Sequence, residues 1–376
     1  MSEPADDRPP FSAADHACMA RALRLAERGL YSTSPNPRVG CVIVRDGQVV
    51  GEGWHERAGG PHAEVHALRA AGKAARGAAV YVTLEPCSHH GRTPPCAHAL
   101  IDAGVARVVA AMRDPYPQVS GRGIELLTLA GIRVEVGLMQ AEARALNPGF
   151  IARMTRGRPW VRVKTAASLD GKTALQSGAS KWITGEVARA DVQRWRARAC
   201  AILTGVGTVL ADDPHLNVRG VDTPRQPMRV IVDGRLDTPP AARILDGGGV
   251  LIACAVEHGE RRRALEAAGA EVLRLPGGEG RVDLPALLTE LARRGVNELH
   301  VEAGARLNGA LLEAGLVDEW LAYFAPVVLG HDARGLFQLP ALTDMAGRRN
   351  FRLEDIRRLG RDLRLTLRPD AGEGIT

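Results

Sequence analysis

Two successive series of apolar segments, each alternating with amphipathic segments, constrain the fold of this chain most strongly. In the first series, short runs rich in β-branched residues alternate with segments that have the apolar spacing of a helix. The expected strands are 39–44, 48–53, 79–84, 107–112 and 133–137, and the expected helices are 11–29, 63–75, 96–103 and 124–130. Such alternation is typical of layered α/β domains.

The alternation breaks at 147–159, where prolines, glycines and arginines cluster, and then resumes. The expected strands of the second series are 161–166, 201–204, 229–232, 250–253, 298–301, 320–328 and 363–367, and the expected helices are 186–199, 261–268, 284–293 and 307–314. A chain of 376 residues is long enough for two domains. We therefore predict two α/β domains, residues 11–156 and 157–376.

Composition narrows the environment and the partners. The first ten residues contain no apolar core of a secretory signal, and no apolar run approaches the roughly 20 residues that span a bilayer. We therefore expect a cytoplasmic protein, in which the six cysteines are core thiols or metal ligands rather than disulfides. The net charge of +6 suits a phosphorylated ligand, although it is also compatible with nucleic acid.

A set of metal-ligand residues stands in the first half of the chain. His62 is followed two residues later by Glu64, and Cys87 and Cys96 each follow a proline. One imidazole and two thiolates are typical catalytic zinc ligands, and they leave a fourth position for water. Glu64, expected at a helix start, can reach that water without binding the metal, as the glutamate does in zinc nucleobase deaminases. These residues predict a zinc deaminase site.

The segment TLEPCSHHGRTPPC resembles the riboflavin-pathway branch of the zinc deaminases, because eight residues rather than two lie between its cysteines. The resemblance implies a three-layer α/β/α, cytidine-deaminase-like fold. It also implies that Asn36, between two prolines, binds substrate, although a plain turn is the alternative. His55 is a second pocket candidate. His89 and His90 line the pocket, sit in solvent, or replace a ligand.

The second half resembles the reductase part of the same bifunctional riboflavin-biosynthesis family, whose fold is similar to dihydrofolate reductase. Four segments carry this resemblance: ASLDGK (167–172), SKWIT (180–184), GTVLADDP (207–214) and VEAG (301–304). Independently of the family, the strand–glycine–helix turn at Gly304 offers free N–H groups to an anion such as a cofactor pyrophosphate. Arg196 and Arg219 are candidates for a substrate phosphate, because the guanidinium matches phosphate geometry.

The resemblance implies specific contacts in this half. The residues expected to contact NADPH are Ala166, Trp182, Thr208, Asp212, Gly304, Ala305, Arg306, Leu307, Asn308, Gly309 and Ala310. The residues expected to contact substrate are Ser180, Arg196, Leu216, Arg219 and Glu302. Trp182 either stacks on a ring or belongs to the core, and Gly234 stands where the family often has a serine near the cofactor.

We therefore predict a bifunctional enzyme of riboflavin biosynthesis that uses zinc and NADPH. Hydroxide on zinc would deaminate 2,5-diamino-6-(5-phosphoribosylamino)pyrimidin-4-one, and NADPH would then reduce the ribosyl group to ribityl phosphate. The expected partner is this small phosphorylated pyrimidine, with no nucleic acid and no membrane, in a homo-oligomer such as a dimer. A nucleic-acid-editing deaminase is the main alternative, but the 4% aromatic content offers few stacking platforms. A structural zinc module and the loss of one activity are further alternatives.

Overall fold

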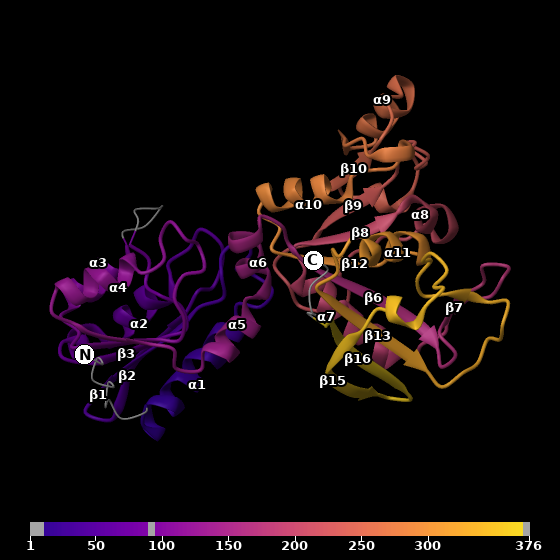
Figure 1. The fold of residues 1–376 in the computed structure, drawn as a ribbon. Coiled ribbons are helices and arrows are strands. Elements are labelled where there is room, and N and C mark those ends of the chain that lie inside the picture. Colours follow the sequence, from indigo (N-terminus) through magenta and orange to yellow (C-terminus); the bar gives the residue numbers. More distant parts are fainter. Residues whose placement is uncertain (1–10, 89–94, 371–376) are drawn as a thin grey trace, which may run out of the picture. The chain divides into compact units, whose positions relative to one another are not determined.

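A computed structural model describes residues 11–88 and 95–370 of the chain (Figure 1). The chain divides into two compact units, Met1–Arg156 and Gly157–Thr376. Each unit has its own sheet and its own buried core. Both are α/β, as the alternating sequence pattern predicted.

The first unit is built on a five-stranded mixed sheet in the order β2-β1-β3-β4-β5. β1 runs antiparallel to both β2 and β3, whereas β3, β4 and β5 are parallel. The strands are β1 Gly40–Arg45, β2 Gln48–Trp54, β3 Ala79–Val82, β4 Arg107–Ala110 and β5 Arg133–Val136. The helices are α1 Ala13–Glu27, α2 Ala63–Ala71, its 3-10 extension η1 Gly72–Ala75, α3 Cys96–Ala103, α4 Arg122–Leu129, α5 Gln140–Leu146 and α6 Pro148–Arg156.

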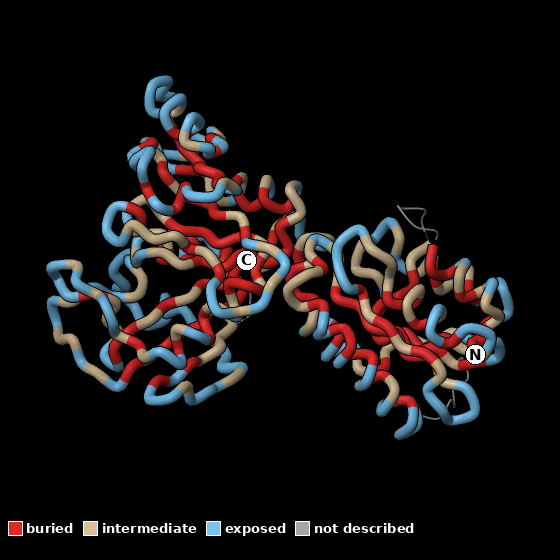
Figure 2. Tube along the Cα trace, turned by 180° about the vertical axis from the view of Figure 1, so that it is seen from behind, coloured by how far each residue is buried: buried red, intermediate tan, exposed pale blue. Residues whose placement is uncertain are grey.

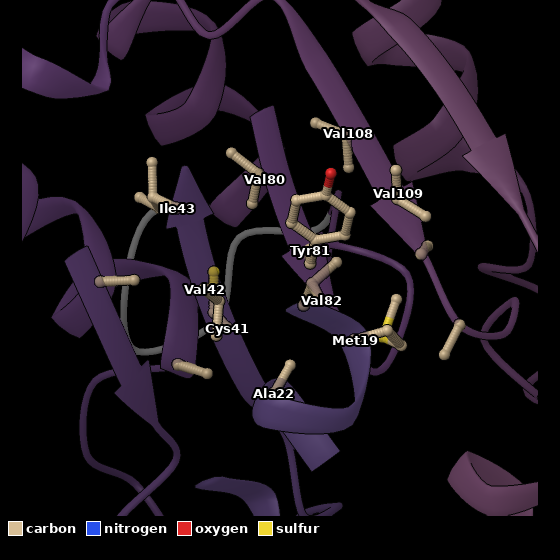
Figure 3. Close-up of a cluster of buried hydrophobic side chains, with 14 of the residues drawn as sticks. Met19, Ala22, Cys41, Val42, Ile43, Val80, Tyr81, Val82, Val108 and Val109 are labelled. Carbon is tan, nitrogen blue, oxygen red and sulfur yellow. The ribbon is translucent and has the colours of Figure 1, made fainter. Parts of the chain in front are cut away.

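Helices cover both faces of this sheet. Successive strand residues point to opposite faces, so the buried strands present apolar side chains to helices on either side. A Cβ at Gly40 of β1 would meet the backbone of α1, whereas one at Gly51 or Gly53 of β2 would meet the backbone of α2. The three glycines thus let one helix approach closely on each side. Figure 3 shows Met19 and Ala22 of α1 beside the buried side chains of the central strands. The result is three layers, with the sheet in the middle.

The second unit contains a nine-stranded sheet in the order β11-β10-β9-β8-β12-β6-β13-β16-β15. Its strands run in one direction except β16, which pairs antiparallel with both β13 and the edge strand β15. The strands are β6 Trp160–Ser168, β8 Ala201–Gly205, β9 Met228–Val232, β10 Val250–Cys254, β11 Ala270–Arg274, β12 Glu298–Val301, β13 Glu319–Ala325, β15 Phe351–Leu359 and β16 Asp362–Pro369, with β7 Lys172–Ala174 and β14 Arg334–Gly335 forming a separate pair. The helices are α7 Glu186–Arg198, α8 Val206–Asp212, α9 Gly259–Ala267, α10 Leu284–Arg293 and α11 Ala305–Glu313, with 3-10 turns η2 Arg243–Leu245, η3 Gly278–Gly280 and η4 Met345–Gly347.

Alternate residues of the central parallel strands feed two separate cores. In β8, Leu203 packs in a cluster with residues of α10 and α11, whereas Ile202 packs in a cluster with Val209 of α8 and Leu265 of α9. In Figure 2 the middle of this unit is drawn largely in red, the colour of buried residues. A strand that is buried on both faces has an unbroken apolar sequence, and this run predicts β8.

The structure differs from the predicted elements in several places. The segment 147–159 was interpreted as a break in the pattern, but most of it is α6. Pro148 is the first residue of this helix. A proline is tolerated there because a backbone N–H at that position would have no acceptor within the helix. The sequence pattern also gave no sign of α5, α8, β11 or β15. β15 is rich in arginine and acidic residues and is mostly exposed, so it lacks the apolar alternation of a half-buried strand.

Candidate active sites

Three predicted metal ligands converge in the first unit. His62 immediately precedes α2, Cys96 is the first residue of α3, and Cys87 lies in the segment that follows β3. One ligand atom from each lies within 4.8 Å of the others. His62 Nδ1 is 3.3 Å from Cys96 Sγ and 3.5 Å from Cys87 Sγ. Residues up to 34 positions apart are therefore brought into one cluster.

These distances fit a zinc ion. Zinc bonds of about 2.3 Å to sulfur and 2.1 Å to nitrogen place tetrahedral S and N ligands about 3.6 Å apart. The backbone N–H of Cys96 donates to Cys87 Sγ at 3.3 Å, a hydrogen bond that favours the thiolate. Hydrogen bonds from Cys96 and His62 lower the pKa of Cys87 to about 4, although burial opposes the shift. The donor set is therefore prepared to bind a divalent metal.

Glu64 lies in the first turn of α2, two residues after His62, and is only 3% exposed. Burial, together with the negative charge of Cys87, raises its pKa to about 7. A carboxyl group with a pKa near neutrality can both accept and donate a proton. The offset of two residues therefore places a buried carboxyl group, with a pKa suited to proton transfer, beside the three candidate metal ligands.

The two pocket residues expected from the resemblance are in contact. Asn36 Nδ2 lies 3.0 Å from His55 Nε2, and the His55 ring is 5.4 Å from the His62 ring, edge to face. His55 Nδ1 is 2.9 Å from the carbonyl oxygen of Pro61, so this nitrogen carries the proton in the neutral ring. Burial lowers the pKa of His55 and favours that neutral form. His89 and His90 lie outside the described residues.

Sequence reasoning missed one residue beside the metal ligands. Glu85 is 5% exposed, and its carboxylate accepts four backbone N–H groups, from Asp114, Gly121, Gly123 and Ile124. It thereby ties the segment that carries Cys87 to the start of α4. A small hollow between these segments is lined by Glu85, Pro86, Cys87, Ser88, Asp114 and Val119. Proximity to the Pro-Cys pair was the only available signal for Glu85.

In the second unit, two helix starts meet at the carboxyl edge of the sheet. β8 leads into α8 through Gly205, and the parallel neighbour β12 leads into α11 through Gly304. Neither glycine can cap the following N–H groups with a side chain, and a Cβ at Gly207 or Gly304 would meet open space. A Cβ at Gly205 would contact Leu307 of α11, so the two turns are adjacent. Uncapped N–H groups beside open space suit the phosphates of a dinucleotide.

An ion cluster lies at the same edge. Arg196 of α7 forms a bidentate pair with Glu302, and Lys164 Nζ of β6 is 3.8 Å from the same carboxylate. Burial alone would raise the pKa of Glu302, but Arg196 and Lys164 hold it well below its usual range. Burial lowers the pKa of Lys164 against the attraction of Glu302. Sequence reasoning missed Lys164, since only the pairing of β6 with β12 brings it near Glu302.

The other predicted contacts are spread around this edge. Trp182 is 69% exposed with Arg189 stacked on its ring, so of the two interpretations of Trp182 the core one is wrong. Asp212 lies 3.9 Å from the Nζ of Lys181. Asn308 and Gly309 are buried against segment 336–338 rather than open. The remaining predicted contacts are half-buried Ala166, Ser180, Thr208, Ala305, Leu307 and Ala310, buried Leu216, and exposed Arg306 and Arg219.

Comparison with known proteins accounts for both units. Residues 12–112 match the family model for the cytidine and deoxycytidylate deaminase zinc-binding region, and residues 159–365 match the RibD C-terminal domain. The riboflavin biosynthesis protein RibD of Escherichia coli is 51% identical over 365 residues, covering 94% of this chain and 99% of that protein. The chain belongs to the RibD family.

Solved structures of RibD proteins share the fold over both units. Acinetobacter baumannii RibD is 47% identical with a TM-score of 0.89, covering 95% of this chain and 99% of that one. A diaminohydroxyphosphoribosylaminopyrimidine deaminase/5-amino-6-(5-phosphoribosylamino)uracil reductase from Thermotoga maritima is 33% identical with a TM-score of 0.83 and the same coverage.

This RibD-family chain is thus a bifunctional enzyme of riboflavin biosynthesis, with a zinc-binding deaminase unit and an NADPH-dependent reductase unit, as the two sequence resemblances predicted. It acts on a small pyrimidine. Among the described residues, no helix combines the length and the apolar character needed to cross a bilayer.

Proposed function

We propose that His62, Cys87 and Cys96 hold the zinc ion of the deaminase and that Glu64 moves the proton. The observation that carries this assignment is the convergence of the three ligand atoms within 4.8 Å, beside a buried carboxyl group. A zinc ion bound here supplies a Lewis acid that lowers the pKa of a water molecule. The carboxylate of Glu64 would accept a proton from the attacking water, whose oxygen bonds to the ring carbon, and would pass that proton to the amino group, which leaves the same carbon as ammonia.

The walls of the site orient the pyrimidine. We propose that the Asn36 amide hydrogen-bonds substrate and that the His55 ring contacts substrate as a wall of the pocket, because the 3.0 Å contact between the two side chains fixes both beside the metal ligands. Neutral His55 presents Nε2 as an acceptor, because Nδ1 carries the proton that faces the Pro61 carbonyl. The amide can then turn its second N–H and its oxygen toward a pyrimidine edge.

Substitution of Glu64 by Gln tests the assignment. The amide occupies the same space but carries no transferable proton, so zinc content should stay stoichiometric and ammonia release should fall by at least ~100-fold, the lower end of what general acid–base catalysis contributes. NADPH oxidation with the deaminated pyrimidine should be unchanged, because Glu64 lies in the other unit. Retained ammonia release with full zinc occupancy would contradict the role of Glu64.

For the reductase we propose that the N-terminal turn of α11 and the Gly205–Thr208 turn receive NADPH, which supplies a hydride when bound. Gly304, Ala305 and Arg306 form the more open part of the α11 turn, and the exposed Trp182 and Asp212 are further NADPH contacts that we propose. Glu302, fixed by Arg196 and next to Lys164, is placed to accept hydrogen bonds from the ribosyl group. Ser180, Leu216 and Arg219 are the further substrate contacts that we propose.

The finer identity of the partners follows from these assignments. We propose that the substrate is 2,5-diamino-6-(5-phosphoribosylamino)pyrimidin-4-one and that its deaminated product is reduced to the ribityl phosphate. Among the described residues, six arginines of α7, β15 and β16 each pair with an acidic residue, which reduces the free positive charge of these elements and supports a small phosphorylated substrate rather than nucleic acid. We also propose a homodimer in the cytoplasm. Sedimentation at equilibrium measures the oligomeric state directly.

A further inference from the structure

The loop that carries Asn36 is held by the last two helices of the first unit. Asn147 joins α5 to α6 and is 3% exposed. Its side-chain oxygen accepts the backbone N–H of Arg38 at 2.8 Å, and its amide nitrogen donates to the carbonyl of Arg38 at 2.9 Å. One amide thus satisfies both backbone groups of a loop residue that is 109 positions away in sequence.

Further hydrogen bonds reinforce this attachment on both sides of Asn36. The Arg38 guanidinium donates to the carbonyl of Leu146, at the end of α5, at 2.8 Å. Arg153 of α6 donates to the carbonyl of Pro35 at 3.1 Å. Pro35, directly before Asn36, and Arg38, two residues after it, are therefore fixed by residues 146–153.

Two further contacts connect this loop to the pocket. The Val39 carbonyl accepts the backbone N–H of His55 at 2.9 Å, and Asn36 itself contacts the His55 ring. A shift of the loop would therefore move both proposed substrate contacts together. Misplacement of a substrate-positioning group by about 1 Å can cost up to ~100-fold in rate.

We propose that Asn147 and Arg153 are positioning residues for deamination, which set the place of Asn36 through the backbone of Pro35 and Arg38. The proposal rests on the proposed role of Asn36 in binding substrate. Both residues contact the backbone of the loop that carries Asn36, so we expect them to act on substrate binding rather than on zinc.

Four variants of the full-length enzyme test this proposal: Asn147→Ala, Arg153→Ala, Arg153→Lys and Asn36→Ala. Loss of a contact made equally in the ground and transition states raises KM with little change in kcat. Asn147→Ala is expected to raise the KM for ammonia release about 10-fold, and Arg153→Ala by a few-fold, with zinc content unchanged. Arg153→Lys should recover most of the loss, because lysine can still donate to the Pro35 carbonyl.

The controls separate positioning from general destabilisation. Arg144→Ala removes a positive charge from the exposed face of α5 and should leave KM unchanged. NADPH oxidation on the same polypeptide should be unchanged in every variant. If Asn147→Ala does not fold, the soluble Arg153 pair decides the outcome alone.

Two distinct failures can be told apart. If Asn36→Ala raises KM but the Asn147 and Arg153 variants do not, the positioning role is wrong and the binding role of Asn36 stands. If Asn36→Ala leaves KM unchanged, the proposed function of Asn36 is wrong and the positioning role falls with it. Loss of zinc in the Arg153→Ala variant would also overturn the proposal.

Discussion

At the scale of single residues, buried charges in this protein are paired with partners from other elements. Asp15 of α1 accepts hydrogen bonds from Tyr81 of β3 and Arg107 of β4, and it also forms the capping box with Ser12. In the second unit, Arg162 of β6 is 1% exposed and pairs with Glu298 and Glu319. Breaking such a pair leaves a charge without its partner in a poorly solvated place.

We predict that Asp15→Asn destabilises the first unit by about 2 kcal/mol at pH 7, because Arg107 loses one of its two charged acceptors and keeps only Glu135. Burial opposes ionisation of Asp15, but Arg107, Tyr81 and Ser12 together hold its pKa far below the usual range. A depressed folded pKa contributes stability above the unfolded pKa of about 4 and loses it as the pH falls further. Urea unfolding of both proteins at pH 7 and pH 3 measures this. Equal differences at the two pH values would contradict it.

A second prediction concerns Arg196. Replacement by Lys keeps the charge but removes the two-pronged pair with Glu302, so Glu302 should lose its orientation. NADPH oxidation should fall by about 10- to 100-fold in kcat/KM, while ammonia release is unchanged. Arg194→Lys, at an exposed position of the same helix, is the matched control. Equal losses in both variants would show that α7 is merely sensitive to substitution.

The site illustrates what sequence can reveal at this scale. His62, Cys87 and Cys96 were predictable because zinc chemistry restricts its ligands to a few residue types at short spacings. Lys164 was not predictable, because a lone lysine in an apolar strand has no spacing partner. Its contact with Glu302 arises only from the parallel pairing of β6 with β12, whose partner residues are far apart in sequence.

At the scale of elements, glycines decide how closely α2 lies on the first sheet. Gly51 and Gly53 of β2 face the α2 backbone, and α2 positions both His62 and Glu64. The approach of the helix therefore fixes the geometry of the metal site. The sequence predicts this strand, at 48–53. It does not predict the close approach of the helix, because a glycine adds nothing to the apolar pattern.

We predict that Gly53→Ala pushes α2 outward, since its Cβ would lie 2.7 Å from the Ala63 carbonyl oxygen and 2.7 Å from the Ala67 nitrogen. Neither backbone atom can move without moving the helix. The variant should lose about 1–3 kcal/mol of stability and hold zinc more weakly. Thermal unfolding and zinc retention against a chelator measure both effects. Val49→Ala, in an exposed position of the same strand, should leave both unchanged.

Element bounds were predictable where the pattern was strong and local. The helices at Cys96–Ala103 and Leu284–Arg293 and the strand Glu298–Val301 agree with their predicted bounds. α6 was missed because arginines and a proline obscured its short apolar face. β15 was missed because an exposed edge strand is held by backbone pairing with β16, which leaves little trace in side-chain pattern.

At the scale of the whole molecule, the two activities depend on separate cores and separate sheets. The three candidate metal ligands, His62, Cys87 and Cys96, all lie in the first unit. The chain therefore carries an internal control for every experiment on either activity.

We predict that prolonged chelation removes zinc and lowers ammonia release by more than ~100-fold, since the water nucleophile loses its activation. NADPH oxidation on the deaminated pyrimidine should remain unchanged, and stoichiometric zinc should restore ammonia release. Parallel assays of the treated enzyme check both outcomes. Loss of reduction together with deamination would show that the second unit depends on the metal.

The order of strands in the second sheet has a consequence for synthesis on the ribosome. β6 is the first strand of this unit to be made, yet its neighbours in the sheet are β12 and β13, with Trp160 aligned to Glu298 and Arg162 to Glu319. The growing reductase must wait for its late strands before β6 is enclosed, whereas the deaminase sheet is complete at β5. A stalled or truncated chain would thus contain a complete deaminase sheet and an incomplete reductase sheet, whose unpaired apolar strands are prone to aggregate.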